Sequence, residues 1–129
     1  MKRRVLLKMG LYLSAMGLPL TSMASENVTS KMTMPETQVI IVFSVKKEKL
    51  VSFLKIIEDV KKKLPLVLGC NGVAVYQNKD DMHCITLVER WESMEKHKNH
   101  IKHVVDSGDW KYISSHLAEE PQSNYYHEL

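Results

Sequence analysis

The sequence predicts one small α+β domain, in which a four-stranded antiparallel sheet carries two helices in the order β-α-β-β-α-β. Three observations support this fold class. A β-branched run near residue 40 precedes a segment with helical periodicity. Two strand-like runs then flank a turn-forming sequence, and a second amphipathic segment is followed by an aromatic run. A chain of 129 residues has room for one such domain.

The first strand is expected over residues 38–45 and the first helix over residues 48–64. The strand is apolar at consecutive positions, so both of its faces should be buried. In the helix, apolar residues recur at i, i+3, i+4 and i+7 spacing. Lys61-Lys62-Lys63 places cations in the last turn, where they favour the helix dipole, and Pro65 lies just beyond it.

Residues 73–77 and 82–91 are expected to form a hairpin, because Asn78-Lys79-Asp80-Asp81 supplies turn-forming side chains between them. We expect Asn78 to lie opposite Asp81. This register brings one set of side chains to a common face of the sheet: Gly72, Ala74, Tyr76, Ile85, Leu87, Glu89 and Trp91.

The same register separates the two cysteines. Cys84 lies opposite Val75, and Cys70 lies opposite Glu89, so the thiols are on the order of 17 Å apart and on opposite faces. A disulfide needs Cα atoms within about 7 Å. We therefore predict two free thiols, although an oxidising compartment would permit a disulfide.

Residues 93–105 are expected to form the second helix, with Asp106-Ser107-Gly108 ending it and a short further helix beyond. Met94, His97, Ile101, Val104 and Val105 fall on or near one face of this helix. The aromatic run Ser123-Asn124-Tyr125-Tyr126-His127 is expected to form the fourth strand, with its register left open.

This order is the ferredoxin-like arrangement, in which both helices pack on one face of the sheet. The first strand is nevertheless apolar on both faces. A second copy packed sheet to sheet would cover the other face, so we expect a homodimer with a barrel-like interior. The alternative is a monomer whose second face is capped by the tail.

Residues 1–24 have the three parts of a secretory signal peptide: the cations Lys2-Arg3-Arg4, an apolar stretch, and Ser22-Met23-Ala24 before the expected cut. The uninterrupted apolar run after Lys8 has only about 12 residues, which disfavours an uncleaved membrane anchor. The mature protein is therefore expected to be periplasmic or secreted, with membrane contact only through this segment. The two arginines also look like a twin-arginine signal, and the export route stays open.

Residues 25–37 are polar and without periodicity, so they are expected to be a flexible tether before a domain at residues 38–129. Four of the 18 basic residues lie in the signal segment, which leaves 14 bases against 15 acids in the rest of the chain. The domain has no basic excess that would indicate nucleic-acid binding.

Residues 38–129 carry three motifs in order. Val67-Leu68-Gly69-Cys70 closes the first helix, Glu89-Arg90-Trp91 ends the third strand, and His100 lies nine residues after Trp91. The stretch resembles the antibiotic biosynthesis monooxygenase (ABM) family, which includes the quinol monooxygenases. The first motif is similar to the family's Pro-Gly-Cys, with Leu68 in place of proline, and the second to its Glu-x-Trp. The resemblance implies a dimeric α+β barrel with a pocket between each sheet and its helices.

The resemblance also implies oxidation of quinols or other electron-rich aromatics by O₂, often without flavin or metal, so no cofactor is expected. A deprotonated quinol passes an electron to O₂ directly when a protein supplies an apolar cavity and a proton acceptor. His100 is the candidate base, because imidazole titrates near neutral pH. Glu89 is a second catalytic candidate, since burial would raise its pKa. The candidate substrate-binding residues are aromatic: Trp91, Tyr76 and Phe43.

Each candidate also has a structural interpretation: Trp91 as a core residue, Glu89 in an ion pair, and His100 as a surface or pocket-lining histidine. His97, His100 and His103 follow one another at steps of three. Such steps rotate around a helix, so the three side chains cannot all face one ion, and no metal site is predicted.

Two other functions stay open. Haem-binding or haem-degrading relatives use the same barrel, with an asparagine on the first strand and an additional tryptophan on the second helix. Here the strand reads Ile41-Val42-Phe43-Ser44 and the helix has no tryptophan, although His100 could still be an axial ligand. The third function is a non-catalytic dimeric module that binds a small apolar molecule.

Overall fold

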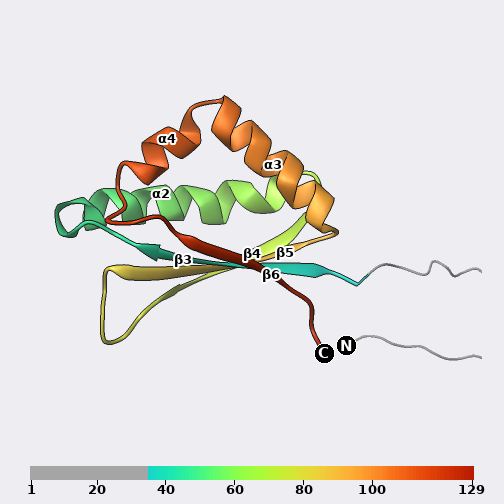
Figure 1. Ribbon diagram of the computed structural model, residues 1–129, viewed down its shortest axis with the longest axis horizontal. Coiled ribbons are helices and arrows are strands. Elements are labelled where there is room, and N and C mark those ends of the chain that lie inside the picture. The colour runs from blue at the N-terminus through green and yellow to red at the C-terminus, as the bar shows by residue number, and fades with distance from the viewer. Residues whose placement is uncertain (1–34) are drawn as a thin grey trace, which may run out of the picture. The chain divides into compact units, whose positions relative to one another are not determined.

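A computed structural model describes residues 35–129, in which four strands form one sheet of order β4-β5-β3-β6 with every neighbouring pair antiparallel. The strands are β3 (Thr37–Ser44), β4 (Cys70–Gln77), β5 (Cys84–Trp91) and β6 (Gln122–Tyr126). The helices all lie on one side of this sheet (Figure 1). The predicted α+β, ferredoxin-like fold is therefore confirmed, whereas the predicted signal peptide and most of the tether lie outside the described residues.

The first helical segment begins as a 3₁₀ turn (Lys47–Lys49), continues as α2 (Leu50–Lys63) and ends in a second 3₁₀ turn (Leu64–Leu66). The second comprises α3 (Met94–Asp106) and the short α4 (Asp109–Ser114). Ser93 caps α3, because its hydroxyl accepts the backbone N–H of Lys96 at 3.2 Å. Across residues 35–129, no helix is both long and apolar enough to cross a membrane.

The hydrophobic core lies between the sheet and the helices. Strand β3 contributes Val39, Ile41 and Phe43, and α2 packs Phe53 and Ile57 against them. The sequence predicts burial of both faces of β3, but the alternate residues of this strand are only half-buried in the single chain. Among residues 35–129, the helices cover one face of the sheet and no helix lies over the other (Figure 1). That other face retains half-buried apolar side chains.

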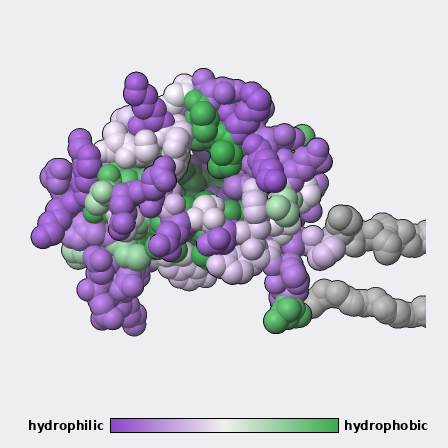
Figure 2. Space-filling view, in the orientation of Figure 1, coloured by the Kyte–Doolittle hydropathy of each residue, from purple (hydrophilic) through white to green (hydrophobic). Residues whose placement is uncertain are grey.

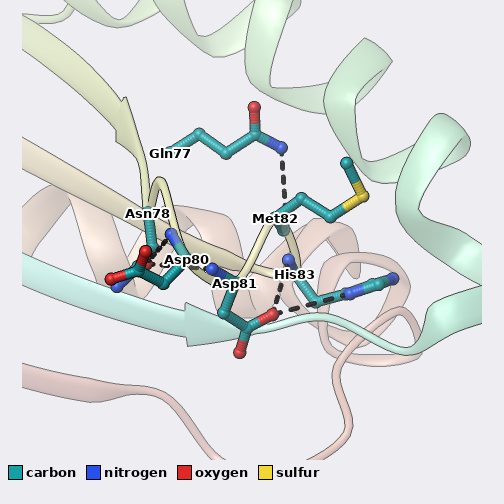
Figure 3. Close-up of polar contacts among 6 residues, drawn as sticks. All are labelled: Gln77, Asn78, Asp80, Asp81, Met82 and His83. Carbon is teal, nitrogen blue, oxygen red and sulfur yellow. Dashed lines mark hydrogen bonds and ion pairs between the residues drawn. The ribbon is translucent and has the colours of Figure 1, made fainter.

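The predicted hairpin register is wrong. Val75 lies opposite Leu87 rather than Cys84, so the pairing is shifted by an odd number of residues. The cause is the loop in Figure 3, in which side chains cap backbone N–H groups. The Asn78 Oδ1 accepts from the N–H of Asp80 at 2.7 Å and of Asp81 at 3.0 Å. These Asx-type bonds, with one from His83 N–H to Asp81 Oδ1 at 3.0 Å, lengthen the turn beyond the predicted four residues.

An odd shift exchanges the two faces of a strand. Tyr76 pairs with Thr86 and lies on the open face, whereas Glu89 and Trp91 face the helices. The expectation that Gly72, Ala74 and Tyr76 share a face with Ile85, Leu87, Glu89 and Trp91 is therefore wrong.

The separation of the two cysteines holds in the observed register. Cys70 pairs with Trp91 at one end of β5, and Cys84 begins β5 at the other end. Both thiols are free, as predicted.

The aromatic pair in the core should dominate the stability of the domain. Phe53 is fully buried, with its ring centroid 5.3 Å from that of Phe43 in an edge-to-face arrangement. We expect Phe53→Ala to lower the free energy of unfolding by about 3–5 kcal/mol, because it leaves a cavity. Val51 is 72% exposed on the same helix, so Val51→Ala should change it by less than about 0.5 kcal/mol. Urea unfolding checks both values, and similar losses in the two variants would contradict the assigned core.

Candidate active site

A pocket of about 630 Å³ lies between the sheet and the helices. Its floor includes Ile41, Phe43 and Leu87 of the sheet, and its walls come from α2, α3 and α4. Figure 2 shows apolar side chains, in green, at the bottom of a hollow on this side of the domain. A pocket of this size and apolar character suits a small-molecule ligand.

Glu89 brings a carboxyl group to this apolar pocket. The residue is 5% exposed, and its Oε1 accepts a hydrogen bond of 2.8 Å from the indole Nε1 of Trp91. Burial raises the pKa of Glu89, and the Trp91 hydrogen bond opposes this in part. The predicted burial of Glu89 is confirmed, although its partner on β4 is Val73 and not Cys70. The raised pKa favours the protonated form of this carboxyl.

His100 brings an imidazole to the same pocket from α3. Burial lowers its pKa, and the neighbouring His103 lowers it further. Its ring centroid lies 5.3 Å from that of Trp91, with the planes inclined by 33°. His100 is therefore held against an aromatic wall in its neutral form, which accepts protons.

His97 lies behind the pocket, between α3 and the sheet. It is 5% exposed, and its Nδ1 is 2.8 Å from the hydroxyl oxygen of Tyr125. Its Nε2 lies 3.8 Å from Oε1 of Glu89 and has no hydrogen-bond partner. Burial, reinforced by His100, lowers the pKa of His97 to about 4, so this imidazole is neutral at physiological pH.

The structure brings three of the five candidate site residues together at the pocket: Glu89, His100 and Phe43. Trp91 is fully buried behind them and supports Glu89 and His100. Tyr76 lies on the other face of the sheet and is 59% exposed, so it does not reach this pocket.

Sequence reasoning gave no role to two parts of the site. Tyr125 faces His97 because it pairs with Val39, and this register could not be read from the aromatic run alone. Ser52 lines the pocket, and its hydroxyl lies 2.9 Å from Nε2 of the buried His116. This contact joins α2 to the segment after α4, and no local sequence pattern signals it.

The three histidines of α3 have different surroundings. His97 is buried against Tyr125, His100 lines the pocket, and His103 is exposed. Within residues 35–129, no three or more histidine, cysteine, aspartate or glutamate side chains are grouped to hold a metal ion.

Several solved structures share this fold. A conserved protein from Methanosarcina mazei superposes with a TM-score of 0.66 at 23% identity, covering 74% of this chain and 95% of its own. A Bordetella bronchiseptica protein named as an antibiotic biosynthesis monooxygenase gives 0.65 at 23% identity, covering 74% and 99%. One from Caulobacter crescentus, similarly named, gives 0.63 at 19% identity, covering 74% and 91%.

A comparison with curated protein sequences gives no match. The family model described as antibiotic biosynthesis monooxygenase matches residues 38–104, more than half of the chain. The matched stretch includes the first three strands of the sheet, α2 and the pocket-lining Glu89 and His100. The chain therefore belongs to the antibiotic biosynthesis monooxygenase family.

Proposed function

We propose that this protein oxidises a quinol or another electron-rich aromatic molecule with O₂ and without a cofactor. The observation that carries the proposal is a neutral imidazole, that of His100, facing an apolar pocket of about 630 Å³. The pocket supplies a dry environment for a flat ring, and the imidazole supplies a proton acceptor.

The reaction balances without an external reductant. A quinol with a free ring position reacts with O₂ to give a hydroxyquinone and water. One oxygen atom replaces a ring hydrogen and the other leaves as water, and all four electrons come from the substrate. The protein's task is to remove the phenolic proton that holds the quinol in its unreactive form, and then to return a proton to the departing oxygen.

The geometry gives each pocket residue a part in this chemistry. His100 takes the phenolic proton, and Trp91 fixes the plane of its ring. Phe43 offers the substrate an aromatic contact from the sheet, and the fully buried Phe53 of α2 packs behind it. Glu89, in its protonated form, is placed to donate a hydrogen bond to an oxygen of the bound molecule.

Oxygen uptake with a chemically reduced naphthoquinol tests the reaction. We expect uptake above the spontaneous rate, and a fall of about 10²–10⁴-fold in His100→Ala, because general base catalysis is lost. His127 is exposed beyond β6 and does not line the pocket, so His127→Ala is the matched control and should retain the activity. Uptake no faster than autoxidation with several quinols would sink the proposal. A haemin titration would then separate a haem-binding relative from a module that binds only a small apolar ligand.

The pH dependence of kcat/KM should carry the signature of His100. The base acts in its neutral form, and its lowered pKa keeps that form populated to lower pH than an ordinary histidine. We therefore expect a flat rate at neutral pH and an acid limb whose midpoint lies below the ordinary value of 6.5. Steady-state rates from pH 4.5 to 8.5 measure it. A midpoint above 6.5 would contradict a base held neutral by burial.

We also propose that the protein works as a homodimer, joined through the open face of the sheet. This face carries the half-buried Ile40, Val42, Ala74 and Val88 with the exposed Tyr76 beside them. Such a patch favours association with a second copy. In sedimentation experiments we expect a dimer for the parent protein and a monomer for Val88→Glu. Leu66→Glu, at an 84% exposed site in the 3₁₀ turn after α2 and outside the strands, should stay dimeric. A monomeric parent protein would refute this arrangement.

A further inference from the structure

A line of polar groups runs from the pocket to the edge of the sheet. Glu89 lines the pocket, His97 lies behind it, and Tyr125 follows on β6, one of the two edge strands. The Tyr125 hydroxyl lies 2.8 Å from His97 Nδ1, and His97 Nε2 lies 3.8 Å from Glu89 Oε1. Glu89 and His97 are each 5% exposed, whereas Tyr125 is half-buried. The line therefore has a closed inner end and a more open outer end.

Counting protons along this line leaves two arrangements. A neutral imidazole carries one N–H, on Nδ1 or on Nε2. With the proton on Nδ1, the ring donates to the Tyr125 oxygen, and the bare Nε2 needs a donor that only a protonated Glu89 can supply among its close neighbours. With the proton on Nε2, the ring donates to an ionised Glu89, and Nδ1 accepts the hydroxyl proton of Tyr125.

The two arrangements differ by one proton. The Glu89 proton moves to Nε2, the Nδ1 proton moves to the tyrosine oxygen, and the original tyrosine proton leaves to solvent. When the three transfers occur together, neither an imidazolium nor a phenolate is formed. This matters because burial lowers the pKa of His97 and raises that of Tyr125, so both charged forms are disfavoured.

We propose that Glu89, His97 and Tyr125 form a proton relay that connects the pocket carboxyl with solvent at the β6 edge of the sheet. The orphaned, buried Nε2 of His97 is the observation that favours it, because a buried imidazole nitrogen without a partner is costly. Closing the gap to Glu89 needs a movement of about 0.6–1 Å to reach hydrogen-bond range.

Other titratable groups surround the relay. Trp91 donates to Glu89 from β5. Burial, with a smaller contribution from the Glu89 carboxylate, raises the pKa of Cys70 on β4. From α3, His100 lowers the pKa of His97, and the Lys98 ammonium lies 6.0 Å from the Tyr125 ring. These neighbours tune the relay but do not bridge it.

The role of the relay in catalysis rests on the proposed function. A bound aromatic molecule that fills the pocket would shut Glu89 off from water on the pocket side. The relay gives this carboxyl a second way to gain or lose a proton while the substrate is bound. Its existence, however, is a property of the resting protein and is open to measurement without any substrate.

The first test is ¹⁵N NMR of the histidines in the resting full-length protein from pH 5 to 9, with infrared spectra of the carboxyl groups. We expect His97 to switch from the Nδ1–H to the Nε2–H tautomer as pH rises. The protonated-carboxyl band should disappear with the same midpoint. Both observations come from the unmodified protein, so they do not depend on whether a variant folds. A His97 tautomer that stays constant while the band titrates would overturn the relay.

Two variants then test whether Glu89 is the group whose titration causes the tautomer switch of His97. Glu89→Gln should abolish the tautomer switch, because the amide does not titrate, whereas Glu92→Gln, at an exposed site on the same segment, should leave it intact. A switch that persists in Glu89→Gln would refute the assignment. A switch seen in a protein that oxidises no quinol would keep the relay and reject the proposed function.

A matched pair of tyrosine variants tests the outer end of the relay. Tyr125→Phe removes the hydroxyl that faces His97, and Tyr126→Phe removes one on the opposite face of the sheet. During quinol oxidation we expect the first variant to lower kcat by about tenfold or more with little change in KM, since proton transfer and not binding is affected. We expect the second variant to match the parent protein. Equal rates in the two variants would remove Tyr125 from the relay.

Discussion

Strand β5 pairs along its length with both β3 and β4, so its side chains alternate strictly between the face under the helices and the open face. This alternation puts Ile85, Leu87, Glu89 and Trp91 in one row beneath the helices. Three of them are apolar, and the fourth is a carboxyl that the same packing removes from water. This row explains three features of the site. Leu87 lies in the pocket floor, burial raises the pKa of Glu89, and the rings of His97 and His100 pack against Trp91.

The fold could be predicted from the sequence because the local spacing of apolar residues indicates each helix and strand. The helical spacing of residues 48–64 and the β-branched run of β3 needed no tertiary information, and all four strands and both main helices were placed. The hairpin register was not accessible. It depends on how Asn78 and Asp81 cap backbone N–H groups in the loop, and residue type alone does not say how many residues such a loop holds. Because the predicted register was shifted by an odd number of residues, it assigned Tyr76 to the wrong face of the sheet.

The residues of the candidate site likewise fall into two groups: those that a local sequence motif predicts, and those that depend on tertiary contacts. Glu89 and His100 are predictable because they match the Glu-x-Trp motif and the helix histidine of the family that the sequence resembles, and Phe43 is predictable as an aromatic residue. The sequence puts His97 on or near one face of its helix and gives it no catalytic role, since its partners come from β5 and β6. Tyr125 is far from His97 along the chain. Contacts of this kind, including that of Ser52 with His116, follow only from the assembled sheet.

Strand β3, the first of the described strands, lies in the interior of the sheet, and one of its two neighbours is β6, the last. During synthesis, β3 can therefore pair with its second neighbour only after almost the whole domain has been made. Pairings between such distant segments are slow to form, because the loop between them must close first. Until β6 docks, an apolar strand edge stays open to other chains. The same late step delivers Tyr125 to His97, so the polar line from the pocket is completed only when the C-terminal segment is in place.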